Sequence, residues 1–218
     1  MIIILISSVH RPPKSSNKDN PLNNSWLLIG SGGHAVSLWS IVRGEIRDLV
    51  VVDPDASRRT RYASYFKPSA WLNSDAEAKR RCNEFSNAIV GVGLINGSTR
   101  VRSQLFSEFQ TTGIPMPAVQ HPSAVVDQTA KTGAGCQIFA HATVNPESQL
   151  GQNVVINTGA IVEHECLVED HAFVAPGAIL CGQVTVGRGA IIGAGAVCLP
   201  GSVIPEHSIV KAGTRFGS

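Results

Sequence analysis

Residues 154–180 read VVINTGAIVEHECLVEDHAFVAPGAIL and repeat a six-residue pattern. A large aliphatic side chain stands at thirteen of fifteen positions spaced six residues apart, as in Ile156, Val162 and Val168. A small or short side chain stands two positions before each of the fifteen. The register runs from residue 126 to residue 210 without a slip, which excludes chance. Its members are Val126, Thr132, Ile138, Val144, Leu150, Ile156, Val162, Val168, Val174, Leu180, Val186, Ile192, Cys198, Ile204 and Val210.

A period of six fits neither the 3.6 residues of a helical turn nor plain strand alternation. It is typical of a solenoid in which each hexad forms one short side and the aliphatic residue points inward. The pattern therefore predicts a parallel β-helix. At three hexads a turn it has about five coils, roughly 24 Å long at the ~4.8 Å strand spacing. The alternative is a β-sandwich with accidental spacing.

Composition narrows the class of protein. The chain has 218 residues, 23.0 kDa and a formal net charge of +2, so it carries no strong basic field for nucleic acid. No apolar run reaches the ~20 residues of a membrane span, and Met1–Ile6 is too short for a secretory signal. Residues 1–24 are expected to form a flexible leader. Five cysteines without a CxxC pair indicate a reduced, cytoplasmic protein and no metal site.

Charge divides the chain in two. Residues 124–214 hold 10 charged side chains, whereas residues 1–123 hold 23. The change falls near His121-Pro122-Ser123, and proline suits a linker better than an element. We therefore expect a front domain over residues 25–122 and the β-helix over residues 123–218.

The front domain begins as a nucleotide-binding α/β unit. Residues 26–29 form an apolar run that ends at Gly30-Ser31-Gly32-Gly33-His34-Ala35, and a helical pattern follows. Residues 49–52 predict a second buried strand, closed by Asp53. The spacing Gly30-x-Gly32-x-x-Ala35 fits the dinucleotide fingerprint, with Asp53 where a ribose-binding acid belongs. A Rossmann-like domain is predicted.

Residues 88–93 predict a further strand and residues 98–110 a helix. The span of residues 25–122 is short for a full dinucleotide fold. Two ligands remain possible for the front domain at this point: NAD, or the nucleotide part of a sugar nucleotide.

His164 is the strongest candidate for chemistry. It stands two residues after inward Val162, at a predicted corner, between Glu163 and Glu165. Two flanking carboxylates would orient an imidazole and stabilise its charged form, which suits a general base. With 18 residues a coil, His164 stacks between Pro146 and Gly182, and the glycine leaves room for a ligand.

Cysteine chemistry is the rival mechanism. Cys136, Cys166 and Cys198 fall on inward positions, where a thiol is an inert core residue. Cys181, next to Gly182, is the cysteine that remains for an acyl-enzyme.

Three motifs carry a family resemblance: residues 157–166 (NTGAIVEHEC), residues 175–178 (APGA) and residues 121–124 (HPSA). Over residues 26–214 the chain resembles hexapeptide-repeat sugar acyltransferases, typified by sialic acid O-acetyltransferase and bacillosamine-type N-acetyltransferase. The resemblance implies a left-handed β-helix, against the usual right-handed crossover preference. It also implies a homotrimer whose active site lies between neighbouring subunits.

The resemblance assigns roles at the catalytic corner. It implies that His164 is the base and that Glu165 orients it. The Gly182 amide would polarise the acetyl carbonyl, and the backbones near Ala194 and Ala212 would line the pantetheine groove of acetyl-CoA.

The resemblance implies that the front domain binds the nucleotide of a sugar nucleotide. His34 is expected either to contact phosphate or to cap the helix that follows. Phe173 stands where many family members carry a second histidine, which is a departure from the pattern. The expected substrate-binding residues are Gly30, Ser31, Gly32, Gly33, His34, Asp53 and Asn157.

The function predicted is acetyl-CoA-dependent N-acetylation of a nucleotide-linked amino sugar in surface glycan synthesis. O-acetylation of sialic acid is an alternative within the same class. A non-catalytic β-helix scaffold or sensor is an alternative outside it.

Overall fold

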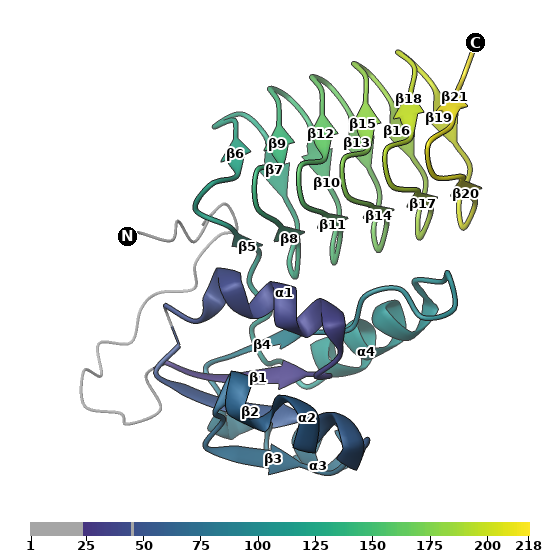
Figure 1. The fold of residues 1–218 in the computed structure, drawn as a ribbon. Helices are drawn as coiled ribbons and strands as arrows, with labels where there is room; N and C mark the ends of the chain where they lie inside the picture. The colour runs from purple at the N-terminus through teal and green to yellow at the C-terminus, as the bar shows by residue number, and fades with distance from the viewer. Residues whose placement is uncertain (1–23, 45) are drawn as a thin grey trace.

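A computed structural model describes residues 24–44 and 46–218. It shows an α/β front domain set against one side of a stack of β coils (Figure 1). Apart from Asn24, the predicted leader over residues 1–24 lies outside the described residues. Within those residues, no helix combines the length and the apolarity that a membrane crossing requires.

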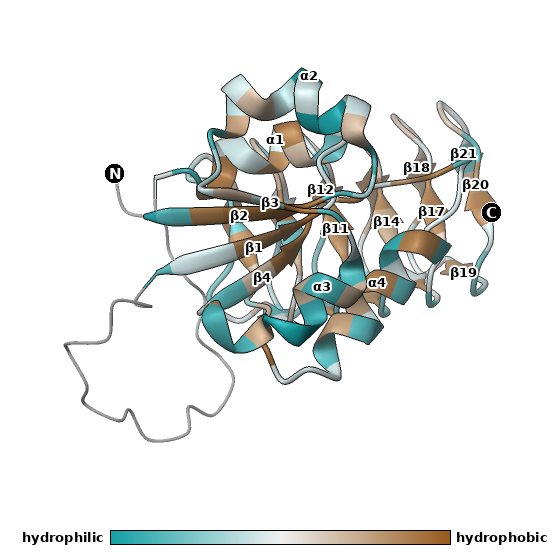
Figure 2. Ribbon diagram, turned by 90° about the horizontal axis from the view of Figure 1, so that it is seen from below, coloured by the Kyte–Doolittle hydropathy of each residue, from teal (hydrophilic) through white to brown (hydrophobic). Residues whose placement is uncertain are grey.

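The front domain is built on a four-stranded parallel sheet of order β3-β2-β1-β4. Its strands are short and apolar, and successive side chains enter opposite faces, so Leu28 and Ile29 are buried in separate clusters. Brown strands between paler helices mark this sheet in Figure 2. The strands are β1 (Ser25–Ile29), β2 (Asp48–Val52), β3 (Ala70–Leu72) and β4 (Asn87–Val90).

Helices cover both faces of the sheet. The buried residues of α1 (Gly33–Val42) and Phe66 at the end of α2 (Ala56–Phe66) pack on one face. The other face carries residues of α3 (Asp75–Arg80) and α4 (Arg100–Gln110), with the short 3-10 turn η1 (Cys82–Glu84) between them. The result is a three-layer α/β/α domain.

The β-helix is confirmed. The described C-terminal residues form strands of two residues, arranged in three parallel sheets with one strand per side of each coil. We call these the β11 sheet (β5, β8, β11, β14, β17, β20), the β12 sheet (β6, β9, β12, β15, β18, β21) and the β13 sheet (β7, β10, β13, β16, β19). Strand β12 pairs with β15 as Val162↔Leu180, which confirms the coil of 18 residues.

The strands of the β-helix all have the same length. They are β5 (Val119–Gln120), β6 (Val125–Val126), β7 (Lys131–Thr132), β8 (Gln137–Ile138), β9 (Thr143–Val144), β10 (Gln149–Leu150), β11 (Val155–Ile156), β12 (Ile161–Val162), β13 (Leu167–Val168), β14 (Phe173–Val174), β15 (Ile179–Leu180), β16 (Thr185–Val186), β17 (Ile191–Ile192), β18 (Val197–Cys198), β19 (Val203–Ile204), β20 (Ile209–Val210) and β21 (Arg215–Phe216).

The predicted inward register forms the core of the coils. Its members are buried from Thr132 to Val210, and Val126 packs against them partly buried. The small residues two positions earlier fill the same core, as Ala160 and Cys166 do. Burial of this continuous stack, at roughly 25 cal/mol for each Å² of apolar surface, stabilises coils that could not bury their faces alone.

Coil pairing starts earlier than the predicted boundary at residues 122 and 123. β5 already pairs with β8, because Val119 lies against Gln137. The His121-Pro122 segment is therefore a corner of the first coil, and the boundary remains a prediction.

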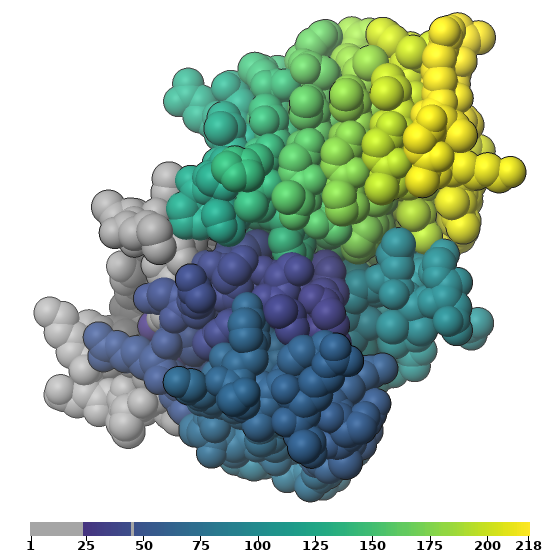
Figure 3. All heavy atoms as spheres, in the orientation of Figure 1, coloured from purple at the N-terminus to yellow at the C-terminus, as the bar shows by residue number. Residues whose placement is uncertain are grey.

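The two domains share a core. Outward residues of the β11 sheet, among them Val155 and Phe173, join one cluster with Leu38 of α1. Figure 3 shows α1 and the coils in direct contact, with the front domain extending beneath the stack from the first coils toward the later ones. The β11 sheet is thus the covered side of the β-helix.

Candidate active site

His164 lies at the corner between β12 and β13, where the repeat places it. Inward Val162 is fully buried, and two residues later the chain has turned out of the core, so the His164 side chain is 56% exposed. Glu165 follows with a φ of 59°, in the left-handed region that this corner requires. The inward register therefore positions the imidazole at the surface.

Glu165 orients the imidazole. Its Oε2 lies 2.9 Å from His164 Nδ1. Hydrogen bonds from His164 and then from Gln183 hold the pKa of the Glu165 carboxyl below its ordinary value. An ionised carboxylate is an acceptor only, so His164 Nδ1 is the donor and the neutral ring keeps its lone pair on Nε2.

Gln183 is a positioning residue that the sequence analysis missed. Its Nε2 donates to Glu165 Oε2 at 3.2 Å, and its backbone N–H donates to the His164 carbonyl at 2.9 Å. Gln183 stands 18 residues after Glu165, one coil further on. The coil spacing places Gln183 beside Glu165, but it does not say toward which neighbour either side chain points.

Glu163 does not share this task, which corrects the expectation of two flanking carboxylates. Its Oε2 accepts a hydrogen bond from Asn145 Nδ2 at 3.0 Å, one coil earlier. Successive residues at a corner point in different directions, so Glu163 pairs along the stack while Glu165 turns to the imidazole.

The absence of a side chain at Gly182 leaves room for the His164 imidazole. The predicted stacking of His164 against Gly182 is confirmed. A Cβ built on Gly182 would lie 2.6 Å from both Cε1 and Nε2 of His164. Among the described residues, no acceptor is hydrogen-bonded to the Gly182 N–H. An unoccupied N–H beside the basic Nε2 is the arrangement that an oxyanion needs.

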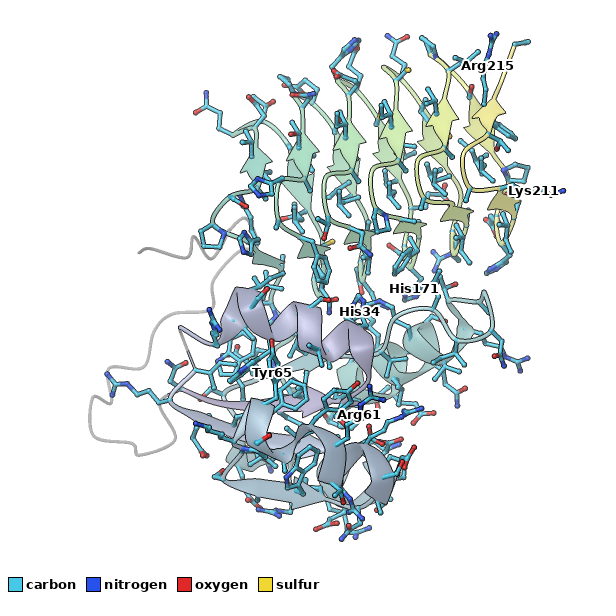
Figure 4. The ribbon with its side chains drawn as sticks, in the orientation of Figure 1. His34, Arg61, Tyr65, His171, Lys211 and Arg215 are labelled. Carbon is cyan, nitrogen blue, oxygen red and sulfur yellow. The ribbon has the colours of Figure 1, made fainter. Side chains whose placement is uncertain are left out.

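A cavity of about 800 Å³ opens between the front domain and the β-helix. Of the predicted substrate residues, Gly32, Gly33, His34 and Asn157 line it. Figure 4 shows His34 at the boundary between α1 and the coils, with Arg61 on the front-domain side. A cavity of this volume suits a ligand of drug or nucleotide size.

Helix α2 supplies charged residues to this cavity that the sequence analysis missed. Arg58 and Arg61 line it together with Tyr62, and Arg61 lies 5.3 Å from the Tyr62 ring centroid. Asp55 caps the helix by accepting from the Ser57 N–H at 2.9 Å. The helix was missed because Phe66 is its one buried residue, so its apolar periodicity is weak.

Gly30, Ser31 and Asp53 lie beneath the cavity instead of lining it, which corrects their expected direct contact with substrate. The Asp53 carboxylate is 1% exposed and accepts from both the N–H and the hydroxyl of Ser31, at 2.8 and 2.7 Å. Gly30 has a φ of 87°, and a Cβ there would strike Val92. Asp53 is occupied in holding the glycine turn, because strand β2 ends beside it.

Phe173, which stands where many family members carry a second histidine, has a packing role in this structure. It is buried in the cavity wall, where its ring lies 6.2 Å from the His34 ring, and Phe139 lies 5.3 Å from the same imidazole. An aromatic side chain here packs the domain interface.

The predicted cofactor residues separate into two groups. Gly182 lies on the His164 corner. Ala194 and Ala212 stack with Pro176 on the corner between the β11 sheet and the β12 sheet, through hydrogen bonds such as Gly213 N–H to the Ala194 carbonyl at 2.8 Å. Pro176 lines the cavity and His164 does not. Within one chain, His164 and the cavity therefore lie on different corners of the β-helix.

The cysteines follow their predicted positions. Cys136, Cys166 and Cys198 are buried and unpaired. Burial raises the pKa of Cys136 to about 12 and that of Cys198 to about 11, so neither thiol is reactive. Cys181 is partly exposed. The described residues contain no group of three or more His, Cys, Asp or Glu that could hold a metal ion.

The chain is similar to known proteins in both sequence and structure. Residues 165–200 match the family described as "Bacterial transferase hexapeptide (six repeats)". PerB from Caulobacter crescentus, in complex with CoA and GDP-perosamine, is 29% identical with a TM-score of 0.77, covering 89% of both chains. The acetyltransferase domain of PglB from Neisseria gonorrhoeae FA1090 is 26% identical with a TM-score of 0.75, covering 89% of this chain and 92% of that one.

The chain resembles the hexapeptide-repeat sugar acetyltransferases over both domains. The resemblance predicted from the motifs is confirmed. A curated sugar acetyltransferase, the GDP-perosamine N-acetyltransferase of Escherichia coli O157:H7, is 29% identical over 111 residues. That match covers 51% of this chain and 49% of the relative, so it spans about half the length of each protein.

Proposed function

We propose that this protein transfers the acetyl group of acetyl-CoA to the amine of a nucleotide-linked amino sugar. The observation that carries the proposal is His164, whose Nδ1 is held by Glu165 and whose Nε2 lies beside Gly182. The similar structures in complex with CoA and GDP-perosamine, or with acetyl-CoA, support these two ligands.

The chemistry follows from the geometry. The neutral amine attacks the thioester carbonyl carbon and forms the C–N bond, while the Gly182 N–H stabilises the oxygen anion. His164 Nε2 takes the proton that the nitrogen loses, and Glu165 stabilises the resulting imidazolium. The C–S bond then breaks, and the CoA sulfur leaves and receives the proton. The products are an amide and free CoA.

The cavity holds the nucleotide in this proposal. Arg61 supplies positive charge for a diphosphate, and the first turn of α1 presents the N–H groups of Gly33 and His34. Arg58 lines the same cavity with its Nε paired to Asp55 Oδ2 at 3.3 Å. The strand order β3-β2-β1-β4 supports a Rossmann-like domain, and the hexads support left-handed coils. Unpaired cysteines support a cytoplasmic location.

Release of free CoA tests the function. We expect acetyl-CoA turnover with GDP-perosamine or with another member of a panel of UDP-, dTDP- and GDP-linked amino sugars, and an N-acetylated product by mass spectrometry. Turnover with free sialic acid alone would favour O-acetylation. Absence of turnover throughout the panel would favour a non-catalytic scaffold.

We also propose a homotrimer, because His164 and the cavity lie on different corners of one chain. A threefold arrangement would set the His164 corner of one subunit against the cavity of the next. Sedimentation at micromolar protein should give a mass near three chains. A monomer that retains full activity would show that one chain suffices.

A further inference from the structure

Gln137 is a polar residue in an apolar interface. It points outward from β8 on the covered side of the β-helix, where its neighbours in the sheet are Val119 and Val155. It is 1% exposed. A buried amide is costly unless it is fully hydrogen-bonded, so its partners determine what it does there.

Both ends of the Gln137 amide are engaged across the domain interface. Nε2 donates to the Val90 carbonyl at 2.8 Å, and Oε1 lies 2.7 Å from His34 Nε2. Because a carbonyl only accepts, the NH₂ group must face Val90, and Oε1 therefore faces His34. Oε1 is an acceptor, so His34 Nε2 carries the proton.

The other ring nitrogen, Nδ1, is left as an acceptor at the cavity. It lies beside Gly93, where an added Cβ would come within 2.9 Å of it. His34 and Gly93 both line the cavity, and no described residue is hydrogen-bonded to Nδ1. A neutral imidazole held in this tautomer accepts a hydrogen bond at Nδ1 and cannot donate one.

We propose that Gln137 is a positioning residue that holds His34 in its neutral Nε2–H tautomer, so that Nδ1 selects substrates with a hydroxyl or amine donor. The inference deepens the proposed function and rests on it for the identity of the substrate. It replaces the expected contact of the His34 side chain with phosphate, since a phosphate oxygen offers no donor to Nδ1.

The charges around His34 favour the neutral ring. Burial, followed by the Arg102 guanidinium of α4, lowers the pKa of His34 to about 4. The charged residues of the cavity wall are Asp55, which caps α2, and Arg58 and Arg61 of α2. Since the lowered pKa lies below neutral pH, the ring is neutral there and stays so until the pH falls toward 4.

Nitrogen NMR of the intact protein tests the tautomer without substrate, with His34→Asn identifying the His34 signals. We expect the Nε2–H pattern, unchanged between pH 6 and 8. Gln137→Glu should raise the pH at which His34 titrates, because a carboxylate stabilises the imidazolium. A wild-type Nδ1–H pattern, or titration of wild-type His34 near pH 6.5, would overturn the proposal.

Calorimetry with GDP-perosamine tests the acceptor. Gln137→Glu should weaken binding about 5-fold, because charging the ring removes the lone pair on Nδ1 and one hydrogen bond is worth about 1 kcal/mol. Gln137→Leu, which leaves Val90 bonded to Arg102 at 3.1 Å, should weaken binding in the same direction. Gln149→Glu adds the same charge at an exposed outward position of β10 and should change nothing.

A contact with phosphate predicts the opposite sign, since a charged His34 donates from Nδ1 and Gln137→Glu would then tighten binding. If wild-type protein binds neither GDP-perosamine nor any other nucleotide-linked amino sugar of the panel, the substrate proposal fails on its own. The NMR spectrum still decides the tautomer.

Discussion

His164→Ala should lower kcat by roughly 10²–10⁴, which is the usual contribution of general acid–base catalysis. In the proposed mechanism the imidazole contacts the reacting amine, and it contacts little of the core, since 56% of its side chain is exposed. The fold and the binding of both substrates should therefore survive, and the loss should appear in kcat and not in KM. Steady-state kinetics and a thermal melt measure the two effects.

Two companion variants separate the mechanisms. Glu165→Gln should cause a smaller drop, since it removes the charge that stabilises the imidazolium while its carbonyl oxygen can still accept from Nδ1. Cys181→Ser should be nearly neutral. An active His164→Ala together with an inactive Cys181→Ser would establish an acyl-enzyme and refute direct transfer.

Gly182→Ala should lower kcat by about 10², although it adds a single methyl group. The new Cβ would come 2.6 Å from His164 Nε2, so the imidazole must move, and misplacing a catalytic group by ~1 Å costs about that factor. The backbone at Gly182 is not in the left-handed region, so alanine brings no strain. Stability should hold or rise by about 0.4–1 kcal/mol.

The combination of lost turnover and retained stability is what distinguishes this effect from misfolding. Gly44→Ala is a matched control, because Gly44 is exposed and an added Cβ there meets no atom within 4 Å. It should leave kcat unchanged. If Gly182→Ala were fully active, the imidazole beside Gly182 would not be the catalytic base.

The β-helix could be predicted from the sequence because each six-residue repeat contains the information for its own part of the structure. Each hexad carries its own inward aliphatic residue and its own corner, so position in the repeat alone assigns Val162 to the core and His164 to the surface. Coil spacing then brings Gly182 against His164, which the structure confirms. Strands β1, β2 and β4 and helices α1 and α4 were likewise predicted, because apolar runs or helical periodicity mark them.

Elements without such a signal were not predicted. Helices α2 and α3 bury one residue each, Phe66 and Ala78, so no apolar stripe marks them. The role of Asp53 was misplaced because a sequence shows that an acid ends a strand but not which way it turns. In the folded protein the Asp53 carboxylate points toward Ser31, and Arg58 lines the cavity in its place.

The sequence by itself determined the six-residue register, the β-helix, the corner that carries His164 and Glu165, and the glycine turn of the front domain. These depend on neighbours in the chain or on a fixed repeat. Only the tertiary structure decided that Gln183 and not Glu163 supports the catalytic pair, that Gln137 reaches His34 across the domains, and that His164 and the cavity lie on separate corners. These contacts depend on how the front domain packs on the β-helix and on the direction in which each corner side chain points. The six-residue periodicity of the sequence specifies neither.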